Sequence, residues 1–294
     1  MSIDSAIQIT LSGLATGSVS ALLLLGILMI FRVSRAVNFA QGQLGMIAAY
    51  VAYAFFAAEV LPVWLAIIIG LALASILSLL TDRIFIERLA SRGALGGQDF
   101  VVTLGVMLLL TAAAETFLGT QTQSFEPLGN DVLFEFRSVI LNANQIIILI
   151  ATVVILIAFA FFLRTRPGVS MRASAINPDL ARSFGVNVSR VKAVTWAVSG
   201  LLAGTVGVIV ASRLSVDPYY MTPFLISAFV AGIIGGLDRF AIPILIAFGL
   251  ALYQNWSAYL FGATAGTASL FILVIVLLAV LPKRFLDERH EARA

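Results

Sequence analysis

The sequence predicts an all-α protein, a polytopic integral membrane bundle of about eight or nine transmembrane or re-entrant segments. Of its 294 residues, 61% are hydrophobic and 11% are charged, and the mean hydropathy is +1.05. No soluble domain of this size has such a composition. Apolar runs of about 20 residues, the length a helix needs to cross the hydrocarbon, recur along the chain. No low-complexity tract interrupts them, so we expect one transmembrane domain over residues 1–294.

Each expected segment is one apolar run bounded by polar or charged residues. In order, the segments are 6–31, 38–58, 60–81, 100–119, 142–163, 193–212, 223–237, 240–260 and 267–282. The run 223–237 is short and 38–58 begins with polar residues, so each is a candidate half-helix or re-entrant piece. A short strand-like piece is expected at Val132–Phe136, in the loop between two spans.

The distribution of basic residues predicts the orientation. If the N-terminus is outside and every segment crosses, only Arg137 and Arg213 lie outside, and nearly all other cations lie inside. The outer loops carry acids instead, such as Glu126 and Asp217. Cytoplasmic loops of membrane proteins are enriched in Lys and Arg, so we expect the C-terminus and the long 164–192 loop to be cytoplasmic.

The 164–192 loop is a candidate docking surface. It carries six basic residues against a single acid, Asp179, and contains one predicted short helix. Asn177 is a good N-cap, Pro178 suits the first helical position, and Gly185 suits a left-handed exit. The alternative is a solvated basic loop facing the lipid surface, and the loop alone does not separate the two.

The residue inventory argues against an enzyme. The one histidine, His290, lies in the C-terminal tail, and there is no cysteine, so a metal site or an intramembrane serine protease lacks its ligands or its base. Neither of the two lysines, Lys192 and Lys283, follows a glycine-rich phosphate loop. If transport is driven by ATP, another chain must bind the nucleotide.

Polar residues inside the spans are costly in lipid and therefore mark candidate functional positions. Asn38, Gln41 and Gln43 stand together beside helix-weakening glycines, which favours backbone lining a cavity; helix packing is the alternative. Glu115 is interpreted as the only carboxylate well inside a span, either in a proton relay or as a glutamate near the outer interface. Of the neighbours Gln254 and Asn255, we expect one to face the pathway.

Two spans share a small-residue pattern that suggests an internal repeat. Gly13-x-x-x-Gly17 and Gly200-x-x-x-Gly204 each begin with Ser-Gly-Leu. Glycines at this spacing let helices approach closely, and simple packing would also explain each pair. At the end of the seventh segment, Asp238-Arg239 follows Gly235, Gly236 and Leu237, which predicts a tight turn or a local ion pair.

Five stretches stand in order along nearly the whole chain: Val37–Gly42, Val102–Gly105, Gly119–Pro127, Arg172–Ala193 and Ala228–Gly236. Together they resemble the membrane subunits of branched-chain amino acid ABC transporters. Val37–Gly42 resembles the family's (I/V)-N-F-A-H-G, and Val102–Gly105 resembles its T-I-G. Gly119–Pro127 resembles the glycine-to-S-F-P outer loop. Arg172–Ala193 resembles the coupling-helix loop, and Ala228–Gly236 resembles the A-F…G-G stretch.

The resemblance implies a permease of the bacterial cell (inner) membrane that works with a second homologous permease subunit, two cytoplasmic ATPases and an extracytoplasmic binding protein. It implies no cofactor on this chain, with ATP and Mg on the ATPases, and no partner but these subunits and membrane lipid, hence no nucleic acid. It assigns ATPase coupling to six residues: Arg172, Asn177, Pro178, Ala181, Arg182 and Gly185. The substrate pathway is expected to involve Asn38, Gln41, Gln43, Thr103 and Glu115.

The expected substrate is a branched-chain or other hydrophobic amino acid, and two departures leave alternatives open. Gln41 stands where the family often has histidine, and Asp238–Ala241 replaces its G-S-x-x-G. Related permeases carry urea and short amides. A secondary transporter coupled to ions or protons through Glu115 is the rival from another class, although the lack of further intramembrane charges argues against it.

Overall fold

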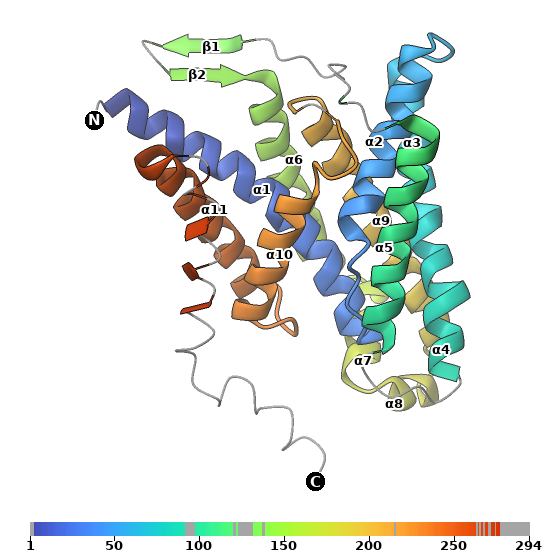
Figure 1. Cartoon of the computed structure of the whole chain (residues 1–294). Helices are drawn as coiled ribbons and strands as arrows, with labels where there is room; N and C mark the ends of the chain where they lie inside the picture. The colour runs from blue at the N-terminus through green and yellow to red at the C-terminus, as the bar shows by residue number, and fades with distance from the viewer. Residues whose placement is uncertain are drawn as a thin grey trace.

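The computed structural model describes residues 3–91, 98–119, 122, 132–136, 139–214 and 216–262, with 264, 266, 268, 269, 272, 273, 275 and 276. These residues form a helical bundle with a small β-hairpin at one end (Figure 1). The long or span-related helices are α1 (Ile3–Ser34), α2 (Gln41–Ala57), α3 (Val63–Leu80), α5 (Gln98–Leu118), α6 (Ala143–Phe162), α9 (Val188–Ala211), α10 (Thr222–Gly235) and α11 (Ala241–Phe261). The shorter elements are the π-helix η1 (Thr81–Ile86), α4 (Glu87–Ser91), α7 (Arg166–Ile176), α8 (Pro178–Ser183), β1 (Val132–Phe136) and β2 (Val139–Asn142).

The expected membrane bundle is confirmed. Among the described residues, six helices are long and apolar enough to cross a membrane: α1, α3 continued through Leu89, α5, α6, α9 and α11. The two segments that the sequence marked as candidate half-helices are the shorter α2, of 17 residues, and α10, of 14. These eight helices match eight of the nine expected segments; most of 267–282 lies outside the described residues.

The packing of the helices agrees with an internal repeat of inverted orientation. If the chain is divided into a first half that begins with α1 and a second half that begins with α9, each first helix packs in the other half. α1 packs against α10 and α11, whereas α9 packs against α2 and α3. α1 and α9 also pack on each other and run in opposite directions (Figure 1). The glycine pairs make these contacts: a Cβ on Gly13 would lie 2.9 Å from Leu252 of α11, and one on Gly200 would lie 2.5 Å from the Ala74 carbonyl of α3.

The two ends of the bundle differ in charge, as the sequence predicts. At one end, which we call the basic end, Arg35 pairs with Asp238 and donates to the Ala175 carbonyl of α7, while Arg83 contacts Ser189. The opposite end carries the N-terminus and the hairpin (Figure 1). The strand expected at Val132–Phe136 is β1, which pairs antiparallel with β2. Residue 137 and the basic tail lie outside the described residues.

The 164–192 stretch is more ordered than a loop with one short helix, which corrects the sequence interpretation. Thr165 caps α7 through a bond from the Gly168 N–H, and Pro167 occupies its first turn. Asn187 accepts from the Arg190 N–H at 2.9 Å, so α9 begins at Val188 rather than near 193. Both helices begin among polar residues. A helix boundary that is placed where an apolar run begins therefore comes too late in the sequence. The tight turn expected at Asp238 is present, but its carboxylate pairs with Arg35 and not with its neighbour Arg239.

Candidate functional site

The short helix predicted in the basic loop is α8, and its ends form as the sequence indicates. The Asn177 carboxamide oxygen accepts from the N–H groups of Asp179, at 3.0 Å, and Leu180, at 2.9 Å. Pro178 occupies the first turn, and Gly185 has a φ of +81°, the left-handed conformation that glycine adopts without strain. Arg182 pairs with Asp179 on the surface, where such a pair contributes only ~0–1 kcal/mol.

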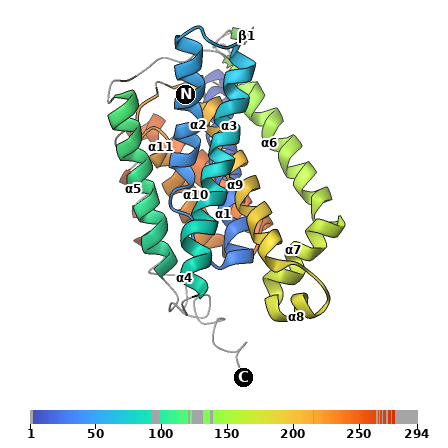
Figure 2. The same ribbon diagram turned by 90° about the vertical axis from the view of Figure 1, so that its right-hand side faces the viewer.

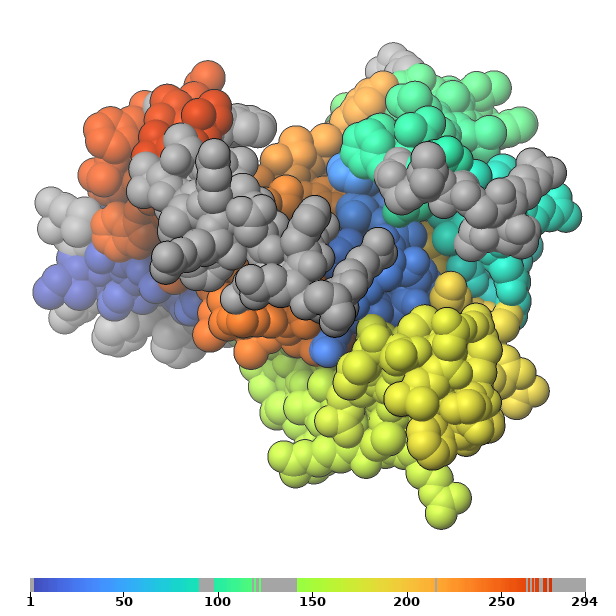
Figure 3. Space-filling model, turned by 90° about the horizontal axis from the view of Figure 1, so that it is seen from below, coloured from blue at the N-terminus to red at the C-terminus, as the bar shows by residue number. Residues whose placement is uncertain are grey.

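The end of α7 and the short helix α8 present large apolar side chains to solvent. Ile176, Leu180 and Phe184 follow one another at intervals of four residues and are 82%, 55% and 80% exposed. We call these three residues the apolar ridge. Arg172 and Arg182 are exposed beside it. Figure 3 shows α7 and α8 as a yellow protrusion from the basic end of the molecule. Large apolar side chains on such a projection are typical of a protein-binding surface.

Ala181 lies on the other face of α8. It is 4% exposed, and its backbone N–H bonds back to the Asn177 carbonyl. A residue buried in this way holds the short helix against the protein and does not itself reach a partner. The exposed part of the candidate coupling surface includes Arg172 and Arg182, which the sequence analysis named, and the apolar ridge, which it did not. Asn177, whose backbone is extended, separates Ile176 at the end of α7 from Leu180 in α8, so helical periodicity does not predict the ridge.

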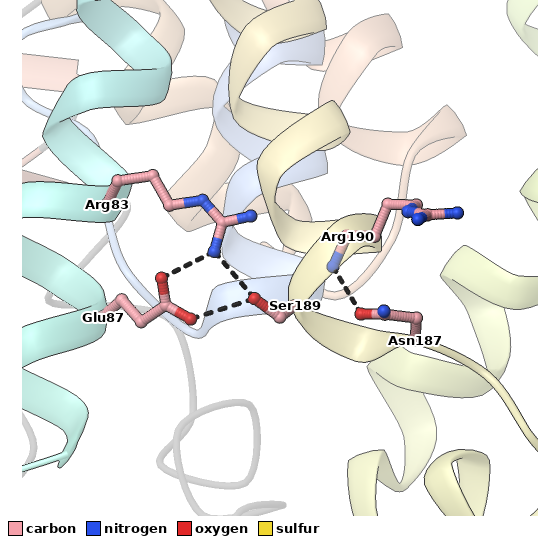
Figure 4. A network of polar contacts seen from close by, with 5 residues as sticks. All are labelled: Arg83, Glu87, Asn187, Ser189 and Arg190. Atoms are coloured by element: carbon pink, nitrogen blue, oxygen red, sulfur yellow. Dashed lines mark hydrogen bonds and ion pairs between the residues drawn. The ribbon is translucent and has the colours of Figure 1, made fainter.

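A polar network at the basic end joins the start of α9 to the end of the third span (Figure 4). Arg83 of η1 pairs with Glu87 at 2.7 Å and donates to the Ser189 hydroxyl at 2.8 Å. Ser189 in turn donates to Glu87 at 2.9 Å. Asn187, beside this network, caps α9. Only residues 184–187 separate α8 from α9, so α8 lies close in sequence to this network, which ties two spans together.

Asp82 is a buried carboxylate that the sequence analysis missed, and it corrects the view that Glu115 is the only one inside a span. It is 2% exposed and lies in η1, within the span Val63–Leu89. Its Oδ1 has no hydrogen-bond partner among the described residues. A charged residue at the end of an apolar run ordinarily lies at the membrane–water interface. Here α3 continues as the π-helix η1, and the Asp82 side chain is buried in the protein. Short π-helical turns are frequent at functional sites.

The predicted amides Asn38 and Gln41 form a hydrogen-bonded cluster in the interior. Asn38 donates to Gln41 Oε1 at 3.0 Å, and Gln41 Nε2 donates to the Ser199 carbonyl at 3.0 Å. The Ser199 hydroxyl also donates to Gln41 Oε1, at 3.1 Å. The cluster presses against Gly26 of α1, whose Cβ, if present, would lie 2.4 Å from Gln41 Nε2. All three polar side chains are fully buried, so the cluster joins α1, α2 and α9 in this conformation.

Two further predicted pathway residues lie close to this cluster. Gln43 follows Gln41 by two residues in α2, and Thr103 of α5 contacts the segment that leads into α2. Gln43 is buried, and its Oε1 has no partner among the described residues, which leaves an acceptor available in the interior. Thr103 donates to the Val37 carbonyl at 2.8 Å and so ties α5 to the segment that leads into α2. Next to this bond, Phe39 stacks on Phe229 of α10 with ring centroids 4.3 Å apart and meets Phe100 of α5 edge-on at 4.7 Å. We call Phe39, Phe100 and Phe229 the aromatic cluster.

Glu115 lies near the opposite end of α5 and has a partner that the sequence did not show. The Tyr219 hydroxyl donates to it at 2.7 Å, and the contact is exposed. Its neighbour Tyr220 donates to the Gly207 carbonyl at 2.9 Å, and burial raises the pKa of that phenol well above its usual value. Tyr220 therefore stays a neutral donor. Glu115 therefore bridges α5 to the loop before α10.

A polar-lined pocket opens in the half of the bundle away from the basic end. Its volume is about 240 Å³, and it lies between α1, α10 and α11. Gln254 and Asn255 both line it, together with Thr16 and Ser227. Asn255 donates to the Ala251 carbonyl, which leaves its oxygen available. Polar side chains within a span are expected to face water, a solute or another subunit.

Comparison with known proteins places the chain in a family. The family model described as branched-chain amino acid transport system / permease component matches residues 9–281. A probable branched-chain amino acid transport permease, LivH of Methanocaldococcus jannaschii, is 25% identical over 272 residues, covering 88% of this chain and 85% of that protein. The high-affinity branched-chain amino acid transport permease LivH of Escherichia coli is 27% identical over 290 residues, covering 93% of each.

Among solved structures, PsaBC from Streptococcus pneumoniae in complex with Fab superposes with a TM-score of 0.48 at 12% sequence identity, covering 96% of this chain and 92% of that one. The family match spans almost the entire length of the present chain, including the amide cluster, the candidate coupling segment and the eight membrane helices. This chain belongs to the family of permease components of branched-chain amino acid transport systems.

Proposed function

We propose that the chain is the translocation subunit of an ATP-driven ABC importer for branched-chain or other hydrophobic amino acids. The observation that carries the proposal is the apolar ridge, which extends from the end of α7 over the capped helix α8 at the basic end of a membrane bundle. Exposed Ile, Leu and Phe side chains beside arginines fit a groove on a cytoplasmic ATPase. The basic residues gathered at that end also predict that it faces the cytoplasm, where an ATPase would bind.

The proposed assembly contains a second homologous permease, two cytoplasmic ATPase subunits that bind ATP and Mg, and an extracytoplasmic binding protein, in the bacterial inner membrane. This chain would supply no catalytic group. Its part would be to convert the motion of α8 into a change at α3 and α9, through the network of Arg83, Glu87 and Ser189.

We propose that the solute passes from the polar pocket at Gln254 and Asn255 toward the aromatic cluster near the basic end. The pocket offers amide and hydroxyl groups for the amino and carboxyl groups of an amino acid. The aromatic cluster offers apolar surface for its side chain. In this conformation Asn38 and Gln41 are closed off by Ser199, so they would contact the solute only after α9 moves away from α2.

The proposal is tested with the chain purified together with its co-encoded ATPases and binding protein and reconstituted in proteoliposomes. Leucine-loaded binding protein should raise ATP hydrolysis and leucine uptake several-fold. If acetamide or urea stimulated ATP hydrolysis and leucine did not, the chain would be an amide permease instead. Uptake that follows an imposed proton gradient without ATP would make the chain a secondary transporter.

The coupling surface has its own test within that system. Leu180→Glu places a charge in the middle of the apolar ridge, at an exposed position where folding does not require leucine. We expect normal membrane insertion, loss of ATPase co-purification and at least tenfold lower uptake. The control is Leu260→Glu, an exposed leucine at the far end of α11. Equal uptake by Leu180→Glu and the parent chain would contradict docking at α8.

A further inference from the structure

An apolar groove opens on the side of the bundle in its basic half. Its volume is about 240 Å³. Leu25 and Met29 of α1 form its floor, Phe159 and Phe162 of α6 form one wall, and Val194 and Val198 of α9 form the other. The groove exists because α6 meets α9 only near its start, where Asn144 donates to the Ile209 carbonyl at 2.8 Å. Toward the basic end the two helices diverge, as Figure 2 shows.

The groove is lined almost entirely by apolar side chains, and ring contacts hold one of its walls. Of the ten described residues that line it, only Thr195 is polar, and its hydroxyl is bonded to the Val191 carbonyl at 2.8 Å. Phe159 is held between Phe162, at 6.1 Å, and Phe240, at 4.8 Å between ring centroids. A preformed, dry groove of this kind suits an apolar chain and offers nothing to a polar solute.

Three arginines, Arg164, Arg166 and Arg190, lie toward the basic end of the groove. Arg190 precedes Val194 and Val198 by four and eight residues and therefore lies on the same face of α9. Arg164 follows Phe162 by two residues, and Arg166 begins α7, whose N-terminal end adds positive partial charge. All three arginines are exposed, and none forms an ion pair within the part of the chain that the structure describes. The nearby acids Asp179 and Glu87 are already paired with Arg182 and Arg83.

We propose that this groove, with Arg164, Arg166 and Arg190 at its mouth, binds one phospholipid with an anionic headgroup from the leaflet at the basic end. From Val194 to Leu202 the lining extends ~12 Å along α9, at ~1.5 Å per residue. That is close to the ~15 Å depth of one leaflet. The apolar lining of the groove and the exposed arginines at its basic end together favour an acyl chain with a phosphate above it.

The site would matter for coupling because it lies between α6 and α9, the two helices that lead into and out of α7 and α8. A lipid wedged there would stabilise the separation of these helices and hence the position of the apolar ridge. The inference is independent of the transported substrate and of ATP. It needs only that the basic end face a leaflet containing anionic lipid.

The test uses the full chain, with the subunits that co-purify, in phosphatidylcholine nanodiscs. A few per cent of a lipid with a photoreactive acyl chain is added, as phosphatidylglycerol in one sample and phosphatidylcholine in the other. We expect phosphatidylglycerol to cross-link α6 over 155–162 and α9 over 194–202 several-fold more than phosphatidylcholine does. Arg190→Gln should reduce this preference about fivefold, the effect of one basic residue at the surface. Arg239→Gln, an exposed arginine elsewhere at the basic end, should leave it unchanged.

A second pair of variants tests the groove itself. Val198→Trp fills it, whereas Leu201→Trp places the same side chain on an exposed, non-lining position of α9. Only Val198→Trp should abolish the preferred cross-links, at an unchanged unfolding midpoint. Equal labelling by both lipids would overturn the proposal in favour of ordinary boundary lipid. Cross-links from the groove to a second permease subunit, in place of lipid, would overturn it in favour of a protein interface.

Discussion

The close approach of α9 to α3 at Gly200 leads to a sharp prediction about stability. A Cβ at this position would lie 2.5 Å from the Ala74 carbonyl oxygen and 2.6 Å from Ser78 Cβ. The first is a backbone atom at a buried position of α3, so it cannot turn aside as a side chain would. Ordinary contact begins near 3.4 Å, and Gly200→Ala must therefore push the two helices apart by roughly 1 Å.

The cost follows from what that separation disturbs. Overpacking a close interface costs ~1–3 kcal/mol. The same interface is held by Ser78 donating to the Trp196 carbonyl at 2.6 Å and Ser75 donating to the Ala197 carbonyl at 2.8 Å. Each such bond contributes ~0.6 kcal/mol between membrane helices. Alanine regains up to ~1 kcal/mol of helix propensity. We expect a net loss of about 1–3 kcal/mol in the free energy of unfolding.

The chain supplies a matched control. Gly249 lies in the middle of α11, and an added Cβ there would meet nothing within 4 Å. Gly249→Ala should therefore stabilise the protein by ~0.5–1 kcal/mol, since only helix propensity changes. The assay is reversible unfolding of the purified protein in mixed detergent, followed by tryptophan fluorescence, to which the buried Trp196 contributes. If Gly200→Ala unfolds at the same denaturant concentration as Gly249→Ala, the close-packing argument is wrong.

Three further predictions concern transport. Glu115→Gln should retain ATP-dependent uptake within about twofold, because the amide still accepts from Tyr219; loss of uphill uptake with independence of the pH gradient would favour proton coupling. Asn38→Leu should lower uptake two- to tenfold, from a lost hydrogen bond of ~0.5–1.5 kcal/mol; an unchanged rate would show that the cluster does not contribute to the pathway. In this cysteine-free chain, Gln41→Cys should react with a small water-soluble thiol reagent only during ATP turnover, because position 41 is fully buried at rest. Labelling that is absent in every state of the cycle would make position 41 a packing residue.

The sequence by itself determined the membrane class, the places of eight helices, the end that carries the charge, and the capped helix at Pro178–Ser183. These features are local. A span depends on a continuous apolar run, and a helix end depends on residues within one turn, such as Asn177 and Gly185. The family resemblance rested on short motifs of the same local kind, and the family match confirmed it.

The tertiary structure alone decided which partners those residues have. Gln41 is bonded to Ser199, 158 positions away, and Glu115 to Tyr219, 104 positions away. The local sequence around these residues does not indicate such pairs, because the pairs form only when α1 packs among the helices of the second half and α9 among those of the first. The burial of Asp82 and the inward face of Ala181 were likewise decided by packing. In a membrane helix every face is apolar, so the sequence pattern does not show which side meets protein and which meets lipid.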